Sequence, residues 1–290
     1  MEPQQKRLFK KIRKGQAVLF LGAGASIDAG LPTGPGLAER LASEFLPDEA
    51  SNSSDFIEVC SRILDTPGID RGQVEDYLRK VLHVAPSESH YDVCRKRWRA
   101  IFTTNFDDLV ETAYRNTTDR KQRCEAVYDS DFSRNQSDYF EVLRLFKLMG
   151  SVSGQDERSR MALSRSDYNR KLRRRGHLFR MLYDFVRDGV IVYVGYSFND
   201  LIARDLIDEV SDEVGLDRLP WSWAILPSWN SDTEILLKQR KILPLRMTFE
   251  EFAQEIRSLP DESEGVQSTT DVLVTVGSSQ IEIDAADYRM

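Results

Sequence analysis

A glycine-rich turn follows the first apolar run of this 290-residue chain. Ala17 to Leu21 is continuously apolar, and the next five residues are Gly22, Ala23, Gly24, Ala25 and Ser26. Glycine lets a backbone approach a pyrophosphate closely, and backbone N–H groups at the start of a helix attract anions. The turn is not a P-loop, because no Lys-Ser/Thr pair follows it. It predicts a phosphate-binding loop, with a tight strand-to-helix turn that binds nothing as the alternative.

Two later segments place small or polar residues directly after a predicted strand. WRAIFTTNFDDLVE (98–111) carries Thr104, Asn105 and Asp107, and VIVYVGYSFND (190–200) carries Gly195 and Ser197. Ligands of open α/β sheets bind outside the carboxyl ends of the strands. Together with the glycine turn, these strand ends predict one dinucleotide site.

The cysteines and histidines do not form a metal-binding pattern. A structural zinc site takes four ligands, usually with cysteines in closely spaced pairs, and the chain has no CxxC. The residues in question are Cys60, Cys94, Cys124, His83, His90 and His177. We expect no metal and no disulfide framework.

Charge and hydropathy limit the partners of the whole chain. The net charge is -7 and the mean hydropathy is -0.44, so overall electrostatics do not favour nucleic acid. The basic clusters 10–14, 95–99 and 171–175 fit solvated helix faces. No apolar run reaches the roughly 18 residues needed to span a membrane, and the basic N-terminus lacks the apolar stretch of a signal peptide. These observations predict a cytoplasmic protein without a membrane partner.

Strand-length apolar runs alternate with longer helical patterns, which favours an α/β fold with a Rossmann-like, doubly wound parallel sheet. The expected strands are 17–21, 100–103, 144–148, 190–194, 222–226 and 242–245, and the expected helices include 37–45, 168–187, 201–214 and 249–259. Residues 46–98 predict a helical insertion, with helices at 54–64, 74–82 and 91–98. We expect one domain over 1–259, followed by an acidic linker and a short β tail over 260–290.

Four motifs, GAGAS, TTNFD, KLMGS and VGYSFND, occur in an order and spacing that resemble the SIR2 family, in its zinc-free type from bacterial antiphage defence. The resemblance covers about residues 15–245. It implies an NAD site in which the GAGAS loop holds the phosphates, Asn105 lies beside the nicotinamide ribose, Asp107 contacts the nicotinamide end and Ser197 touches the cofactor.

This chain departs from the family pattern at two points. It lacks the four-cysteine zinc ribbon of the deacetylases and has GLPTG (30–34) in place of their GIPDFR, which favours NAD degradation over lysine deacylation. Where the family motif KLHGS has histidine, this chain has Met149. A thioether cannot take a proton, and a general base typically contributes about 10²–10⁴-fold. We expect structural roles for His90 and His177.

The resemblance therefore implies an NAD hydrolase, converting NAD to nicotinamide and ADP-ribose, that acts as an antiphage effector with Met149 limiting its activity. The alternative is an inactive NAD- or ADP-ribose-binding regulatory module, and a protein deacylase is a third interpretation. A homo-oligomer or a companion defence protein is expected as partner. The predicted catalytic residues are Asn105 and Asp107, and the predicted cofactor-binding residues are Gly22, Ala23, Gly24, Ala25, Ser26, Thr104, Met149, Gly195 and Ser197.

Overall fold

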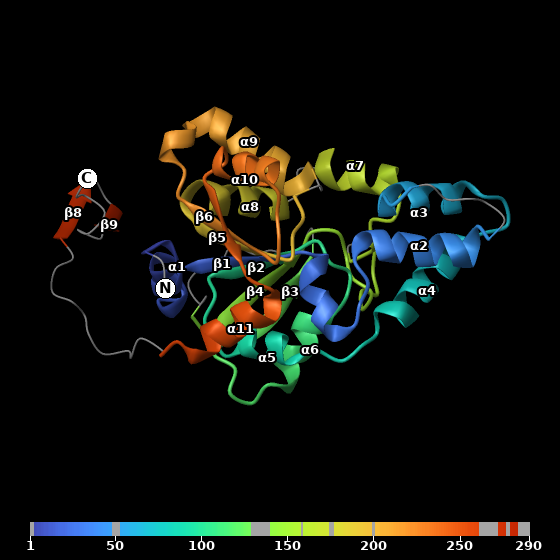
Figure 1. Ribbon diagram of the computed structural model, residues 1–290, viewed down its shortest axis with the longest axis horizontal. Coiled ribbons are helices and arrows are strands. Elements are labelled where there is room, and N and C mark those ends of the chain that lie inside the picture. Colours follow the sequence, from blue (N-terminus) through green and yellow to red (C-terminus); the bar gives the residue numbers. More distant parts are fainter. Residues whose placement is uncertain are drawn as a thin grey trace. The chain divides into compact units, whose positions relative to one another are not determined.

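The chain divides into two compact units, residues 1–260 and 261–290, in the computed structural model (Figure 1). The structure describes residues 3–47, 53–128, 140–157, 159–173, 177–198, 201–260, 272–276 and 279–283.

A seven-stranded parallel sheet forms the centre of the first unit, in the order β3-β4-β2-β1-β5-β6-β7. Its strands are β1 (Ala17–Leu21), β2 (Ala100–Thr103), β3 (Arg123–Val127), β4 (Val142–Lys147), β5 (Val190–Val194), β6 (Ser222–Leu226) and β7 (Ile242–Arg246). Leu21 is in register with Thr103 on one side and with Val194 on the other. The three strands that carry the predicted motifs are therefore neighbours and end at one level. The predicted doubly wound α/β sheet is confirmed.

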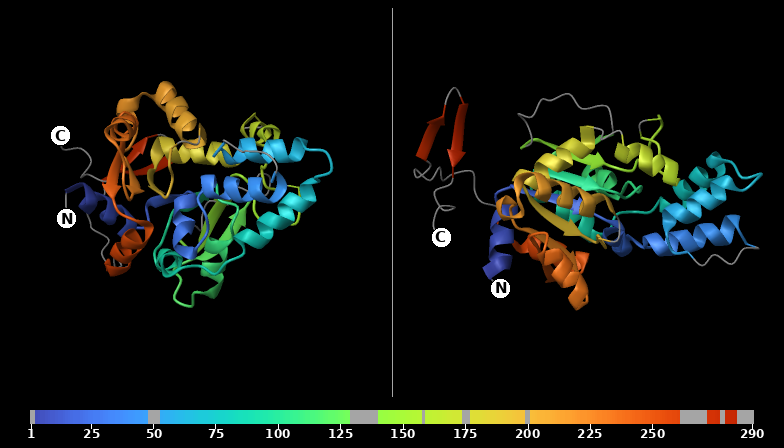
Figure 2. Two further views of the ribbon diagram at one scale, coloured as in Figure 1. Left: turned by 45° about the vertical axis from the view of Figure 1, so that its right-hand side comes forward. Right: turned by 90° about the horizontal axis from the view of Figure 1, so that it is seen from above.

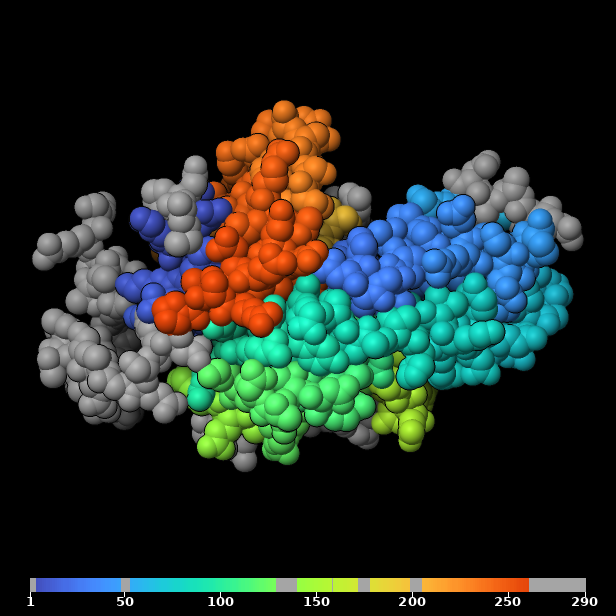
Figure 3. All heavy atoms as spheres, turned by 60° about the horizontal axis from the view of Figure 1, so that its bottom comes forward, coloured from blue at the N-terminus to red at the C-terminus, as the bar shows by residue number. Residues whose placement is uncertain are grey.

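Helices cover both faces of this sheet. Helices α8 (His177–Asp188), α9 (Leu201–Val214) and α10 (Ser231–Lys238) lie on one face, and α1 (Pro3–Arg13), α5 (Glu88–Cys94), α6 (Leu109–Asn116) and α11 (Phe249–Ser258) on the other. In β1, Val18 and Phe20 belong to the first apolar cluster, whereas Leu19 and Leu21 belong to the second. This alternation explains the continuous apolar run, since a strand buried on both faces needs apolar side chains at every position. Figure 3 shows α11 lying against α5 on the second face.

A third apolar cluster lies beyond the carboxyl ends of the strands (Figures 1 and 2). It contains α2 (Gly34–Phe45), α3 (Phe56–Asp65) and α4 (Arg71–Leu82), together with Leu109, Val152 and Leu163 from segments that follow β2 and β4. The insertion predicted for 46–98 is thus divided. Its α3 and α4 join α2 in this cluster, whereas α5 packs on the sheet because Val93 and Cys94 face the second apolar cluster.

Local side-chain contacts explain where several helices begin. Asp70 accepts a hydrogen bond from Gln73 N while the Gln73 side chain accepts one from Asp70 N, which forms a capping box at α4. Thr248 and Glu251 make the same pair of contacts at α11. At α2, Thr33 accepts from Gly36 N.

The predicted helix 168–187 corresponds to two helices, α7 (Arg165–Arg173) and α8, and residues 174–176 lie outside the described part of the chain. Three elements were not predicted: α6, α10 and the edge strand β3. The sequence of β3, RCEAV, has two charges in five residues and little apolar pattern. An edge strand tolerates such residues because only one of its sides is paired.

The second unit contains a strand pair. Strand β8 (Val272–Val276) pairs antiparallel with β9 (Ser279–Ile283), near the predicted short strands. The linker predicted from residue 260 falls almost entirely outside the described residues. Among the helices that the structure describes, none is long and apolar enough to cross a membrane.

Candidate functional site

The loops that follow β1 and β5 are joined by their backbones. Gly22 N donates to Val194 O at 3.0 Å, and Gly24 N donates to Gly195 O at 2.8 Å. The short 3₁₀ helix η1 (Ala23–Ala29) begins directly after Gly22. These two N–H groups therefore hold the glycine turn against the end of β5.

The contact between the two loops requires glycine on both sides. A Cβ on Gly24 would lie 2.7 Å from Gly195 Cα, and a Cβ on Gly195 would lie 2.2 Å from Ala25 N. Gly195 also has a φ of +62°, in the left-handed region that glycine adopts without steric cost. The predicted residues Gly22 to Ser26 and Gly195 are thus brought into one place.

Asn105, from the turn after β2, is clamped to the glycine turn. Its Nδ2 donates to Gly22 O and to Ser26 Oγ, each at 3.0 Å. A carbonyl can only accept, so the Asn105 atom that faces Gly22 is the amide nitrogen. Because the amide nitrogen makes both contacts, Oδ1 is the Asn105 side-chain atom that can accept a hydrogen bond from a ligand or a water molecule.

Asp107 completes a chain of hydrogen bonds through the same serine. Ser26 Oγ donates to Asp107 Oδ2 at 2.8 Å, while Leu109 N donates to Oδ1 at 3.3 Å. The Asp107 side chain is buried, and its carboxylate accepts the hydrogen bond of the Ser26 hydroxyl. The polarity of the chain is therefore defined: Asn105 donates to Ser26, and Ser26 donates to Asp107.

Thr103 ties the ends of β1 and β2 together. Its Oγ1 donates to Leu21 O and accepts from Asn105 N, both at 3.0 Å. Sequence reasoning passed over this residue, although a hydroxyl at the last strand position before TNFD was a usable signal. Thr104, predicted to contact the cofactor, is partly buried in the same turn.

The KLMGS segment packs against the turn after β2. Val152 N donates to Phe106 O at 2.9 Å, and Met149 O accepts from Ala162 N at 2.8 Å. Met149 is buried in the apolar cluster on the α8 face, and the hydrogen-bonded network of Ser26, Asn105 and Asp107 does not include it. Ser197 is exposed in the loop that follows β5. The structure thus gathers most of the predicted site, with Met149 set apart from its polar network.

His90 is a buried neighbour of the network. Its Nδ1 accepts from Ser87 N at 3.3 Å, and its ring lies edge-on to Phe249, with 5.2 Å between ring centroids. Burial lowers the pKa of His90, and the charges of Asp107 and Asp28 oppose that shift only in part. The Ser87-x-x-His90 spacing at the start of α5 could have indicated this placement.

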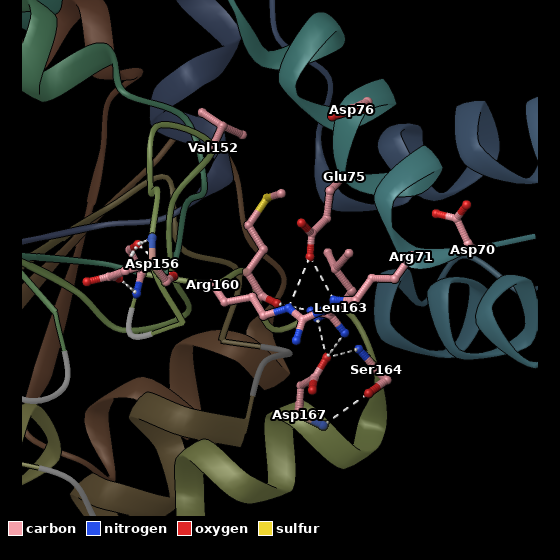
Figure 4. A network of polar contacts seen from close by, with 12 residues as sticks. Asp70, Arg71, Glu75, Asp76, Val152, Asp156, Arg160, Leu163, Ser164 and Asp167 are labelled. Carbon is pink, nitrogen blue, oxygen red and sulfur yellow. Dashed lines mark hydrogen bonds and ion pairs between the residues drawn. The ribbon is translucent and has the colours of Figure 1, made fainter.

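A polar network fastens α4 to the segment that follows KLMGS (Figure 4). Arg71 donates to Asp167 Oδ2 and to Met161 O, each at 2.6 Å, and to Glu75 Oε1 at 2.7 Å. Arg160 adds a 3.3 Å contact to Glu75. The Arg71 guanidinium therefore connects α4, α7 and the segment that follows KLMGS.

Within the described ranges, no group of three or more His, Cys, Asp or Glu residues is arranged to hold a metal ion. Burial raises the pKa of Cys60 and Cys94 to about 12, so these thiols are poor ligands near neutral pH. The absence of a metal stays a prediction.

One protein family and two named proteins match this chain. The SIR2-like domain family matches residues 99–245. The NAD(+) hydrolase ThsA of Bacillus cereus is 23% identical over 199 residues, which are 66% of this chain and 39% of that protein. ThsA of Enterococcus faecium is 24% identical over 212 residues, 71% of this chain and 42% of that protein. The chain therefore spans about two fifths of the length of these relatives.

Solved Sir2 structures resemble this chain at low identity. A mutant Sir2 homologue in complex with ADP-ribose has a TM-score of 0.49 and 18% identity, with 89% of this chain and 95% of that chain covered. A Sir2 homologue in complex with NAD has a TM-score of 0.47 and 16% identity, with 87% and 92% covered. The family match alone spans just over half of the 290 residues, and the chain belongs to the SIR2-like domain family.

Proposed function

We propose that this domain binds NAD at the carboxyl ends of β1, β2 and β5 and hydrolyses it to nicotinamide and ADP-ribose. The observation that carries the proposal is the pair of hydrogen bonds by which Asn105 Nδ2 is held to the glycine turn. The two ThsA relatives, which are named NAD(+) hydrolases, support the same assignment.

Hydrolysis of NAD depends more on the positions of the ribose and the water than on an acid catalyst, because nicotinamide leaves without being protonated. A water oxygen forms a bond to ribose C1′ while the C1′–N bond breaks, and its electron pair leaves with nicotinamide as a neutral pyridine. The transition state has oxocarbenium character, as in other glycosyl cleavages. Asn105 Oδ1 would orient the water or a ribose hydroxyl, and the water's proton would pass to solvent or to a base.

Asp107 supports that geometry in two ways. It accepts from Ser26, which in turn fixes the Asn105 amide. Its buried negative charge would also stabilise positive charge that develops at the ribose. The glycine turn, which Gly24 N fixes to Gly195 O, would bind the pyrophosphate.

Met149 is the proposed limit on activity. In this position the SIR2 pattern has a histidine, whose ordinary pKa of about 6.5 suits a base near neutral pH. Met149→His should raise NAD turnover by about 10² or more, the usual range for a general base. Nicotinamide release, followed by chromatography, measures this, and Asn105→Ala in the same background should abolish the gain.

Because Met149 is buried in an apolar cluster, Met149→His should lower the thermal unfolding midpoint, so a gain in turnover would not reflect better folding. An unchanged turnover in Met149→His, at an NAD concentration where calorimetry shows binding, would reject a general base at this position.

Met149 favours a second candidate: a module that binds NAD or ADP-ribose without cleaving it and regulates a partner. Calorimetry with ADP-ribose, combined with no nicotinamide release from either form, would favour that function. An antiphage role, a cytoplasmic location and a homo-oligomer or companion protein stay predictions. Phage challenge of cells that carry the chain tests the first of them.

A further inference from the structure

Lys147, the first residue of KLMGS, is a buried cation. Its side chain is 1% exposed, and it lies at the last residue of β4, two positions before Met149. A buried ammonium group is costly unless it is paired and hydrogen-bonded. The contacts of this lysine therefore show what its burial serves.

Both partners of Lys147 belong to the segment that begins with the TTNFD turn. Nζ donates a hydrogen bond to the backbone carbonyl of Asp107, and it lies 3.1 Å from Glu111 Oε1 in α6. Burial by itself lowers the pKa of Lys147, but the charges of Glu111 and Asp107 outweigh it and raise that pKa above its ordinary value. The side chain is therefore a cation at neutral pH.

Two neighbouring carbonyls of the turn are thus occupied from the β4 side. Phe106 O accepts from Val152 N, and Asp107 O accepts from Lys147 Nζ. The side chains of Asn105 and Asp107 meet Ser26 on the other side. Two peptide planes held in this way restrict the backbone dihedral angles of the turn, and so fix where the side chains of Asn105 and Asp107 leave the backbone.

We propose that Lys147 is a positioning residue, which holds the turn after β2 in the orientation that presents Asn105 and Asp107 to the glycine loop. The proposal rests on the proposed NAD hydrolysis for its kinetic consequence. Its structural consequence, the position of the Asn105 amide, can be measured without any turnover.

The competing explanation is that the ion pair of Lys147 and Glu111 only stabilises the fold. Substitution of one or both of its members separates this explanation from a positioning role. Removal of one member of a buried pair is strongly destabilising, whereas replacement of both by apolar residues of similar volume is often neutral. Lys147→Met alone should therefore unfold at lower temperature. The double variant Lys147→Met with Glu111→Leu should recover much of that loss, yet it leaves Asp107 O without its donor.

The experiment compares the double variant with its parent, both carrying Met149→His. We expect kcat for NAD to fall by about 10-fold or more, in line with the sensitivity of catalysis to small misplacements, while KM changes less. Selective nitrogen-15 asparagine labelling should show that the Asn105 side-chain amide resonance moves. Lys147→Arg, which keeps a donor, should restore part of kcat.

The control is an ion pair between the turn that follows α10 and helix α9. Arg240 donates to Asp208 at 2.7 Å, and Arg240→Met should leave kcat and the Asn105 resonance unchanged. A folded double variant with parental kcat, or with an unmoved Asn105 resonance, overturns the proposal. If the parent releases no nicotinamide, the proposed function fails, and the resonance alone then decides whether Lys147 positions the turn.

Discussion

At the scale of single residues, Gly195 meets two demands at once, a left-handed φ and the absence of a Cβ. Gly195→Ala should lose roughly 1–2 kcal/mol from the backbone conformation and a further 1–3 kcal/mol, approximately, from overpacking against Ala25. Gly68 separates these causes, because its φ is +89° and a Cβ at this position would have no neighbour within 4 Å.

Gly68→Ala should therefore show the backbone loss alone. Urea unfolding of both variants measures the difference. Equal losses at the two positions would mean that the β5 loop moves away from the glycine turn without cost.

His90 gives the stability of the domain a pH dependence near neutrality. Its folded-state pKa is lowered, mainly by burial, so protonation is harder in the folded than in the unfolded chain. Its contribution is therefore fully present above the ordinary pKa of about 6.5 and is lost as the pH falls through the lower folded pKa.

His90→Gln should flatten the decline in unfolding free energy between about pH 7 and pH 5. Glutamine does not titrate, and it can still accept from Ser87 N at the third helical position. His83→Gln, at an exposed histidine, controls for the loss of an imidazole as such. An unaltered profile in His90→Gln would assign the pH dependence to other groups.

At the scale of elements, Arg71 joins α4 to the segment after β4 and to α7 (Figure 4). Arg71→Met should cost about 2–3 kcal/mol, because it removes a charge-assisted hydrogen bond from each of two largely buried carboxylates, Glu75 and Asp167. The exposed pair Lys238–Glu234 is the control, and Lys238→Met should cost less than about 1 kcal/mol. Similar losses in urea unfolding would contradict a special role for the Arg71 network.

The Arg71 network also makes the stability of the domain depend on pH in the acidic range. Burial raises the pKa of Asp167, but hydrogen bonds from Arg71 and Ser164 outweigh it and hold that pKa below its ordinary range. Its stabilisation is therefore present above about pH 4 and is lost as the pH falls further. The Arg71→Met variant should accordingly lose less stability on acidification than the parent.

Elements with strong apolar patterns could be predicted from sequence. β1, β2, β5 and β6 have the expected limits, because each is a nearly unbroken apolar run. β3 could not be predicted, since its pairing with β4 at the sheet edge supplies what its composition lacks. The division of the helical insertion also depended on tertiary packing, because Leu78 of α4 and Val93 of α5 belong to different apolar clusters.

The site shows the same division. Strand-end position predicted that Gly22, Ser26 and Asn105 would meet, because parallel neighbours end at one edge of the sheet. Thr103 and His90 had weaker signals, a hydroxyl at a strand end and the Ser87-x-x-His90 spacing, and Lys147 had none. Their importance comes from which backbone carbonyls and side chains they contact, and single-residue spacing does not encode those contacts.

At the scale of the whole chain, residues 1–260 form a compact unit with its own core. A chain that ends at Pro260 should therefore melt within about 2–4 °C of the full chain, the shift that 1 kcal/mol produces in a domain of this size. Calorimetry measures this. A larger drop would show that residues 261–290 contribute to the stability of the first unit.

The position of β1 in the sheet also sets an order of events during synthesis. Ala17 pairs with Val190, about 170 residues later, and ribosomes add about 5–20 residues per second. One edge of this apolar strand therefore waits roughly ten to thirty seconds for its partner, a period in which a chaperone could shield it. The backbone N–H groups of Gly22 and Gly24 donate hydrogen bonds to the end of β5. The glycine turn is therefore synthesised early, but it can reach its final conformation only after β5 has been made.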